Sequence, residues 1–237
     1  MGMRLSIVTP PIAEPVGLDE MKLFLRVTGT SDDQLIRQLI RTAREYCERF
    51  TERQLVSTQY RLTVDFFPVY IIQGVFALAE YQTLPYNSQA GAALAQDVDY
   101  GVLTPADIRK MTLPNVGNFT LPRPPLVSVD FVTYVDEDGV TQTLDPATYS
   151  VVTSNIPGYL KTLNGWPAVK GNTPDCVNVT FTSGYPLPEN VPEVYKTAIK
   201  LMASFYYENR IPVAGADAAI AQCVDRLLFQ EKQFSMA

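Results

Sequence analysis

The sequence predicts an α+β fold: a small α-helical bundle formed by N- and C-terminal helices, with a β-rich, sandwich-like insertion between them. Apolar residues recur at helical spacing from Leu18 to Phe50 and again from Val194 to Arg210. Between these segments, apolar and polar residues alternate and are punctuated by Pro and Gly turns, which is typical of strands. The chain has 237 residues and is 46% hydrophobic, enough to bury a substantial core.

The N-terminal helical segment is predicted to consist of two helices. The first runs from Leu18 past Leu25 and is expected to end at Gly29. The second is capped by Ser31 or Asp32, and its apolar stripe is Leu35, Ile36, Leu39, Ile40, Ala43, Cys47 and Phe50.

A charged stripe is expected on the opposite side of this second helix. It consists of Arg37, Arg41, Arg44 and Glu48. A solvated face is the favoured interpretation, because charged helix faces are usually exposed to water. A contact with a neighbouring subunit is the alternative, and it requires a complementary acidic strip on that neighbour.

The middle of the chain is predicted to be mainly β structure. A strand from Val56 to Phe66 is followed by residues 69–118, an atypical insertion that contains a tract rich in Ala, Gly and Gln at Ser88–Gln96. Asp136–Gly139 has the Asp-Gly chemistry of a hairpin turn. Further strands are expected at Phe119–Leu121, Val127–Val135, Tyr149–Val152, Tyr159–Leu160 and Val177–Phe181.

The C-terminal helical segment is predicted to begin near Pro192 and to resume from Ala218 to Phe229. Its buried stripe is expected to be Tyr195, Ala198, Ile199, Met202, Phe205 and Tyr206. The predicted organisation is therefore an N-terminal arm at 1–17, a helical bundle from 18–54 and 192–229, a β-rich domain at 55–191 and a C-terminal tail at 230–237.

Composition argues against catalysis and against a strong grip on nucleic acid. The chain has no histidine, the commonest proton shuttle and metal ligand at neutral pH. Its 19 Lys and Arg against 25 Asp and Glu give a formal net charge of -6, which disfavours phosphate binding. The three cysteines are far apart and suit reduced thiols. No catalytic residue, cofactor or metal site is therefore expected. No membrane span is expected either, because the longest apolar run, Val69–Ala79, is interrupted at Gln73 and Gly74.

Two local features nevertheless keep other functions open. The acidic run Asp136–Asp138 is best explained by the hairpin turn, but a histidine-free hydrolase with a carboxylate pair is a possible interpretation. Trp166 lies on a loop bounded by Gly and Pro and is a candidate exposed anchor. With the strand-rich middle, it motivates a carbohydrate- or ligand-binding β module as the alternative function.

The order of several segments resembles the head-tail connector (adaptor, head completion) proteins of tailed double-stranded DNA bacteriophages. The resemblance covers Leu18 to Phe67 and Phe119 to Arg210, and its main phrases are LDEMKLFLRV, SDDQLIRQLIRTAREYCERF, LPRPPLVSVDFVTYVDEDGV and VPEVYKTAIKLMASFYYENR. Residues 69–118 depart from the usual pattern because they are longer than the family commonly allows.

This resemblance implies a structural virion protein and no enzyme. It implies a homo-oligomeric ring of about twelve copies in the head-tail neck, assembled in the host cytoplasm. The ring docks under the portal protein and meets a tail-side neck or tail completion protein, and double-stranded DNA passes its channel without specific binding. The resemblance places the portal contact at the C-terminus, at Arg226, Phe229, Gln230, Lys232 and Phe234, and subunit contacts are expected at Arg37, Arg41, Arg44, Glu48 and Trp166.

Overall fold

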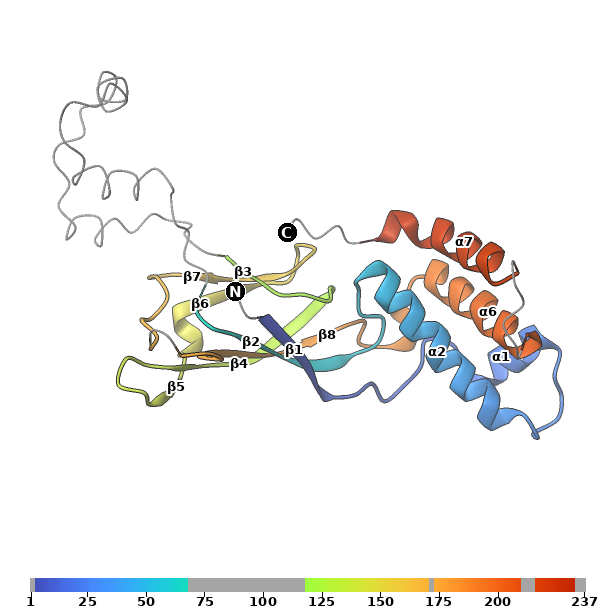
Figure 1. The fold of residues 1–237 in the computed structure, drawn as a ribbon, viewed down its shortest axis with the longest axis horizontal. Coiled ribbons are helices and arrows are strands. Elements are labelled where there is room, and N and C mark those ends of the chain that lie inside the picture. Colours follow the sequence, from blue (N-terminus) through green and yellow to red (C-terminus); the bar gives the residue numbers. More distant parts are fainter. Residues whose placement is uncertain (1–2, 68–117, 171–172, 210–215, 233–237) are drawn as a thin grey trace, which may run out of the picture.

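The computed structural model describes residues 3–67, 118–170, 173–209 and 216–232 (Figure 1). Within them the fold is a mixture of α and β structure with four α-helices and two antiparallel sheets, as the sequence predicts in outline. The helices lie together at one end of the molecule and the sheets at the other (Figure 1). The predicted insertion at 69–118 lies outside the described residues, except for Asn118.

The four helices enclose the first of two apolar cores. They are α1 (Leu18–Leu25), α2 (Asp33–Thr51), α6 (Glu193–Glu208) and α7 (Ala216–Leu228). The predicted stripe of α6 is confirmed at its centre, where Ile199 and Met202 are buried, whereas Phe205 and Tyr206 are only half-buried. The fully buried Tyr195 is the largest side chain of this core.

The larger sheet has five strands in the order β1-β2-β8-β4-β5, all antiparallel to their neighbours. Its strands are β1 (Met3–Thr9), β2 (Thr58–Val64), β4 (Leu126–Val135), β5 (Thr141–Thr143) and β8 (Val177–Ser183). The central strands β2 and β8 pair in register from Thr58–Ser183 to Val64–Val177, although they are more than a hundred residues apart.

A second, three-stranded sheet packs on the larger one. It consists of β3 (Phe119–Thr120), β6 (Tyr149–Val152) and β7 (Tyr159–Thr162), in the order β3-β7-β6. Side chains from both sheets form the second apolar core, which includes Leu62, Val132, Leu160 and Phe181. Alternation along β2 explains this core, since Tyr60, Leu62 and Val64 share one face of the strand.

The local sequence signals are accurate at the hairpin and less so at helix ends. Gly139 adopts a φ of 86°, and Asp136 accepts a hydrogen bond from the Val140 N–H, as the predicted turn requires. Helix α1 ends at Arg26, which adopts a φ of 59°, rather than at the predicted Gly29. Residues 3–9, within the predicted N-terminal arm, form strand β1.

The three cysteines should differ sharply in reactivity. Cys47 and Cys176 are buried, and burial raises the pKa of the Cys47 thiol to about 12, whereas Cys223 on α7 is exposed. Because the thiolate is the reactive form, one thiol per chain should react rapidly with Ellman's reagent in the unassembled native protein. All three should react in denaturant. Cys223→Ser is the matched control and should abolish the fast phase; a fast phase that survives it would contradict the buried placement of the other two.

Candidate assembly surfaces

A buried polar network lies where the helices meet the larger sheet. Within α2, Arg44 forms an ion pair with Glu48. The Nε of Arg44 also donates a hydrogen bond to Glu14 Oε2 at 2.7 Å. Glu48 Oε1 also accepts hydrogen bonds from the Leu55 N–H at 3.0 Å and from Gln54 Nε2 at 2.8 Å. Burial raises the pKa of Glu48, while the Arg44 charge and the Leu55 N–H oppose that rise. Every ionised atom of this cluster therefore has a partner inside the chain.

The network continues directly into the strands. Gln54 Oε1 accepts from the Tyr60 hydroxyl at 2.6 Å, and the Gln54 N–H donates to the Pro124 carbonyl at 2.9 Å. Arg123 Nη1 donates to the Glu48 carbonyl at 3.0 Å. These bonds join the end of α2 to β2 and to the loop before β4, so they hold the helices and the sheet in a fixed relative orientation.

The predicted solvated face of α2 is therefore wrong for two of its four residues. Arg44 and Glu48 are buried inside the chain, because α2 packs against the segment that contains Glu14 and against the Gln54–Leu55 connection. They are not exposed for the predicted subunit contact. Arg37 and Arg41 are exposed, and Arg41 lies 3.8 Å from Glu14.

Trp166, the predicted exposed anchor, packs instead against the β core. Its ring stacks on Phe67 with centroids 4.8 Å apart and an interplanar angle of 2°, and it meets Phe119 edge-on at 6.3 Å. The indole also borders an open depression of about 450 Å³ beside Asn164. Because Phe67 covers one face of the ring, Trp166 is explained by aromatic packing.

The acidic run at the hairpin acts as a turn. Asp136 accepts hydrogen bonds from the Val140 N–H at 2.8 Å and from Gln142 Nε2 at 2.9 Å, and these bonds, that from Gln142 foremost, lower the pKa of its carboxyl group. No cluster of three or more His, Cys, Asp or Glu side chains suited to a metal occurs in the described part of the chain. The sequence has a second acidic pair, Asp97 and Asp99, which lies outside the described residues.

Three of the five predicted portal-contact residues lie on the surface at the C-terminal end of the described chain. Arg226, Phe229 and Gln230 are exposed, and Phe229 is 58% exposed. Lys232 lies over the Phe50 ring, 5.1 Å from its centroid, and Phe234 is outside the described residues. The Glu231 carbonyl accepts from Arg53 Nε at 2.7 Å, so this end is held against the helices.

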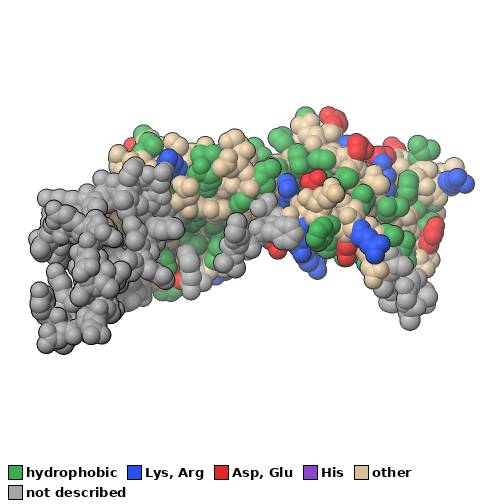
Figure 2. Space-filling view, turned by 90° about the horizontal axis from the view of Figure 1, so that it is seen from above, with side chains coloured by type: hydrophobic (Ala, Val, Ile, Leu, Met, Phe, Trp, Pro, Cys, Tyr) green, Lys and Arg blue, Asp and Glu red, His purple; other side chains and the backbone are tan. Residues whose placement is uncertain are grey.

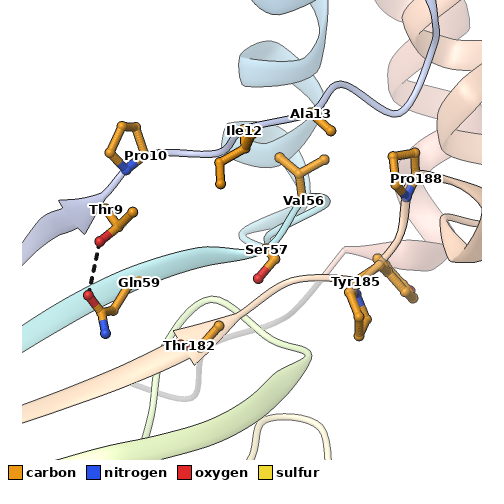
Figure 3. A pocket seen from close by; sticks show the side chains of 11 residues that line it. Thr9, Pro10, Ile12, Ala13, Val56, Ser57, Gln59, Thr182, Tyr185 and Pro188 are labelled. Carbon is orange, nitrogen blue, oxygen red and sulfur yellow. Dashed lines mark hydrogen bonds between the residues drawn. The ribbon is translucent and has the colours of Figure 1, made fainter.

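A groove lies beside the junction, which is the place where the helices meet the larger sheet. It runs between residues 9–13 and the segments around Val56 and Tyr185 (Figure 3). Its volume is about 400 Å³, and the side chains lining it carry no formal charge at neutral pH. Thr9 Oγ1 donates to Gln59 Oε1 across its edge at 3.0 Å (Figure 3). With hydroxyl, amide, proline and aliphatic groups in its lining, the groove suits contact with another chain better than acid–base chemistry.

One surface was missed by the sequence analysis. Strand β1 and the loop after it expose Met3, Ile7, Val8 and Ile12, and Ile12 is 97% exposed. The sequence signal for this strand was present, because Met3, Leu5 and Ile7 alternate with Arg4 and Ser6, which is the period of a strand.

Charged side chains gather over the helical end of the face shown in Figure 2. No helix in the described residues is both long and apolar enough to cross a membrane.

Comparison with known proteins places these surfaces in context. Residues 16–99 match the family model described as phage gp6-like head-tail connector protein. No curated protein matches the chain. Three similar solved structures belong to gene transfer agent (GTA) particles, each at 18% sequence identity.

The structural likeness extends over almost the whole chain. The neck of an empty GTA particle, computed with C6 symmetry, matches with a TM-score of 0.66 over 99% of this chain and 97% of the other. The neck of a native particle, computed with C12 symmetry, gives 0.65 over 99% and 97%, and the virion of native GTA gives 0.64 over 98% and 97%. Over residues 16–99 the chain therefore matches the head-tail connector family that its sequence resembles, and over nearly its whole length it shares a fold with the GTA neck structures.

Proposed function

We propose that the chain is a structural adaptor of the virion neck, where copies form a ring that joins the DNA-filled head to the tail. The observation that carries this proposal is the combination of the connector-family match at residues 16–99 with a fold shared over nearly the whole chain with neck proteins. The role is structural, and the protein is not an enzyme. The buried Arg44–Glu48 network supports this role, because it fixes the angle between helices and sheets that ring geometry depends on.

In its finer organisation, the subunit is a helical bundle that carries a β-rich extension. Two separate apolar cores support this division, one among the four helices and one between the two sheets. The bundle is the part that repeats around the ring, and the extension reaches toward the tail or a neighbouring copy.

The proposed ring holds twelve copies, docks under the portal protein and meets a tail-side neck or tail completion protein. The similar necks computed with C6 and C12 symmetry support this copy number. Double-stranded DNA passes through the channel without specific binding. The net charge of -6 supports free passage, since a lumen without dense Lys and Arg makes few phosphate contacts.

Native mass spectrometry of the purified chain, alone and mixed with its portal ring, tests the proposal. The expected result is a complex of twelve copies on the portal and a matching ring of density between head and tail in images of the particle. A chain that stays monomeric and unbound in the presence of portal, or a particle whose neck lacks it, contradicts the proposal.

The C-terminal portal contact makes a separate prediction. Replacing the exposed Phe229 with aspartate should weaken portal binding by about tenfold or more, because losing an apolar anchor at an interface typically costs at least 1–2 kcal/mol. Biolayer interferometry on immobilised portal rings measures the change. Phe131→Asp, at a 42% exposed site on β4, is the matched control and should bind normally. Equal affinity for both variants would place the portal contact elsewhere.

A further inference from the structure

Strand β1 presents an open hydrogen-bonding edge. Among the described residues it pairs only with β2, so the backbone groups on its other side face outward. Natural edge strands are usually blunted by proline or several charges, whereas Met3–Ile7 carries one charge, on Arg4. Met3 is 65% exposed and Ile7 is 58% exposed, although both are apolar. A strand of this kind is suited to pairing with another chain.

The opposite edge of the same sheet is also open. Strand β5 pairs only with β4 in the described part of the chain, and all three of its residues are exposed. Its extended stretch continues to Leu144, whose N–H donates to the Val132 carbonyl at 2.8 Å. Residues 140–144 and Met3–Ile7 are therefore open stretches of equal length at the two edges of one sheet.

The direction and register of the two edges also agree. Four successive antiparallel pairings separate β1 from β5, so the two strands run in the same direction. One row across the sheet reads Met3, Val64, Val177, Tyr134 and Gln142. A copy related by rotation about an axis along the strands would therefore bring its β1 alongside β5 in parallel and at the same height.

Charge is complementary at one end of these edges. Arg4 lies near the start of β1. A second arginine, Arg61, lies on the neighbouring strand β2, where it pairs with Ser6. The hairpin before β5 exposes Glu137 and Asp138 at that same end of the sheet. Local counter-charges lie at both edges: Arg4 contacts Asp175 at 3.0 Å, and Asp65 accepts a hydrogen bond from the Asp175 N–H. At the other edge, Lys170 lies against the hairpin at Gly139. The exposed carboxylates of one copy and the arginines of the next are thus of opposite sign.

We propose that β1 of one copy pairs in parallel with β5 of the next, so that the five-stranded sheets continue from subunit to subunit around the ring. This inference rests on the ring of the proposed function and names the strands that close it. Two different edges meet, which is the head-to-tail contact that a closed ring of identical subunits requires. The exposed Met3 and Ile7 become covered at this contact.

Disulfide trapping tests the pairing directly. Thr143→Cys is combined with either Arg4→Cys or Ser6→Cys in a Cys223→Ser background. Thr143, Arg4 and Ser6 lie on the same face of the sheet, so their side chains point to the same side. Four strand spacings separate the edges within one copy, about 19 Å, whereas a disulfide joins Cα atoms about 4.4–6.8 Å apart. Any bond formed must therefore link two copies.

Oxidised portal-bound rings should give a ladder of covalent oligomers on a non-reducing gel for at least one of the two pairs. Thr143→Cys with Thr42→Cys, an exposed site on α2, is the control and should give none. Complete rings in which neither pair cross-links overturn the edge pairing and leave the adaptor function intact. If the parent chain forms no ring with portal, the adaptor function fails and the pairing fails with it.

A charge on the edge provides an independent readout. Ile7→Lys should raise the concentration needed for ring assembly by about tenfold or more, because a lysine on an edge strand opposes pairing. Leu163→Lys, at a 57% exposed site after β7, is matched in exposure and should assemble normally. Far-ultraviolet circular dichroism checks that both variants are folded. Unchanged assembly of the folded Ile7→Lys protein would count against the proposal.

Discussion

Replacing Arg44 with alanine is expected to lower the free energy of unfolding by about 3–5 kcal/mol. The side chain of Arg44 is 5% exposed and is the cationic partner of both Glu14 and Glu48. Without it, the Glu48 carboxylate stays buried beside the Leu55 N–H and loses its counter-charge. Urea denaturation followed by circular dichroism at 222 nm measures the loss.

Arg41→Ala is the matched control for this experiment. Arg41 is on the same helix, is 69% exposed and lies 3.8 Å from the same Glu14. Its loss should cost less than about 1 kcal/mol, because exposed ion pairs are screened by water. If the two variants lost similar stability, the buried network would not be what fixes the junction. Arg44→Ala should also assemble poorly on the portal at temperatures where it is still folded, because the helices and sheets lose their fixed angle.

Replacing Gly184 with alanine should be comparably damaging, for a steric reason. Gly184 adopts a φ of 107°, and a Cβ there would lie 2.3 Å from the Val56 carbonyl oxygen and 2.9 Å from the Ser57 nitrogen. The strained backbone costs about 1–3 kcal/mol. Overpacking against a backbone that cannot move aside costs about 1–3 kcal/mol more. Urea denaturation of Gly184→Ala is expected to show the sum of these two costs as a loss in the free energy of unfolding.

Gly165→Ala separates these two contributions. Gly165 has a similar φ of 90°, but a Cβ there meets no atom within 4 Å. This control should therefore show the conformational cost alone. The difference between the two variants reports how tightly the Val56–Ser57 connection is packed against the end of β8. A Gly184→Ala protein as stable as Gly165→Ala would mean that the connection can move aside.

Local signals in the sequence predicted most of the secondary structure. The two helical segments, the Asp136–Gly139 hairpin and the strands at 149–152 and 177–181 all follow from spacing and turn chemistry that act within a few residues. The end of α1 is an exception, because Arg26 takes the left-handed conformation that Gly29 was expected to supply. Any residue able to tolerate that φ can end a helix, so glycine alone does not determine the boundary.

Side-chain environments were less predictable. Arg44 and Glu48 lie on the polar side of α2 when the helix is considered alone, yet they are buried because Glu14, Gln54 and Leu55 cover that side. Trp166 is on a loop, but Phe67 and Phe119 place it against the β core. Glu14, Phe67 and Phe119 are distant in the sequence from the residues that they cover, and Gln54 and Leu55 lie beyond the end of α2. The helical pattern of one segment therefore carries no information about these contacts.

The sequence by itself determined the α+β class, the order of elements and the resemblance to head-tail connector proteins, because these depend on local periodicity and on several segments in a fixed order. Only the tertiary structure decided that β2 pairs with β8, that β1 and β5 are left as the two open edges among the described residues, and that hydrogen bonds through Gln54 and Arg123 join the end of α2 to the strands. The physical reason is the separation in the sequence of the residues that interact. Helix and turn preferences act between near neighbours, whereas sheet order and burial depend on contacts that exist only after the whole chain has folded.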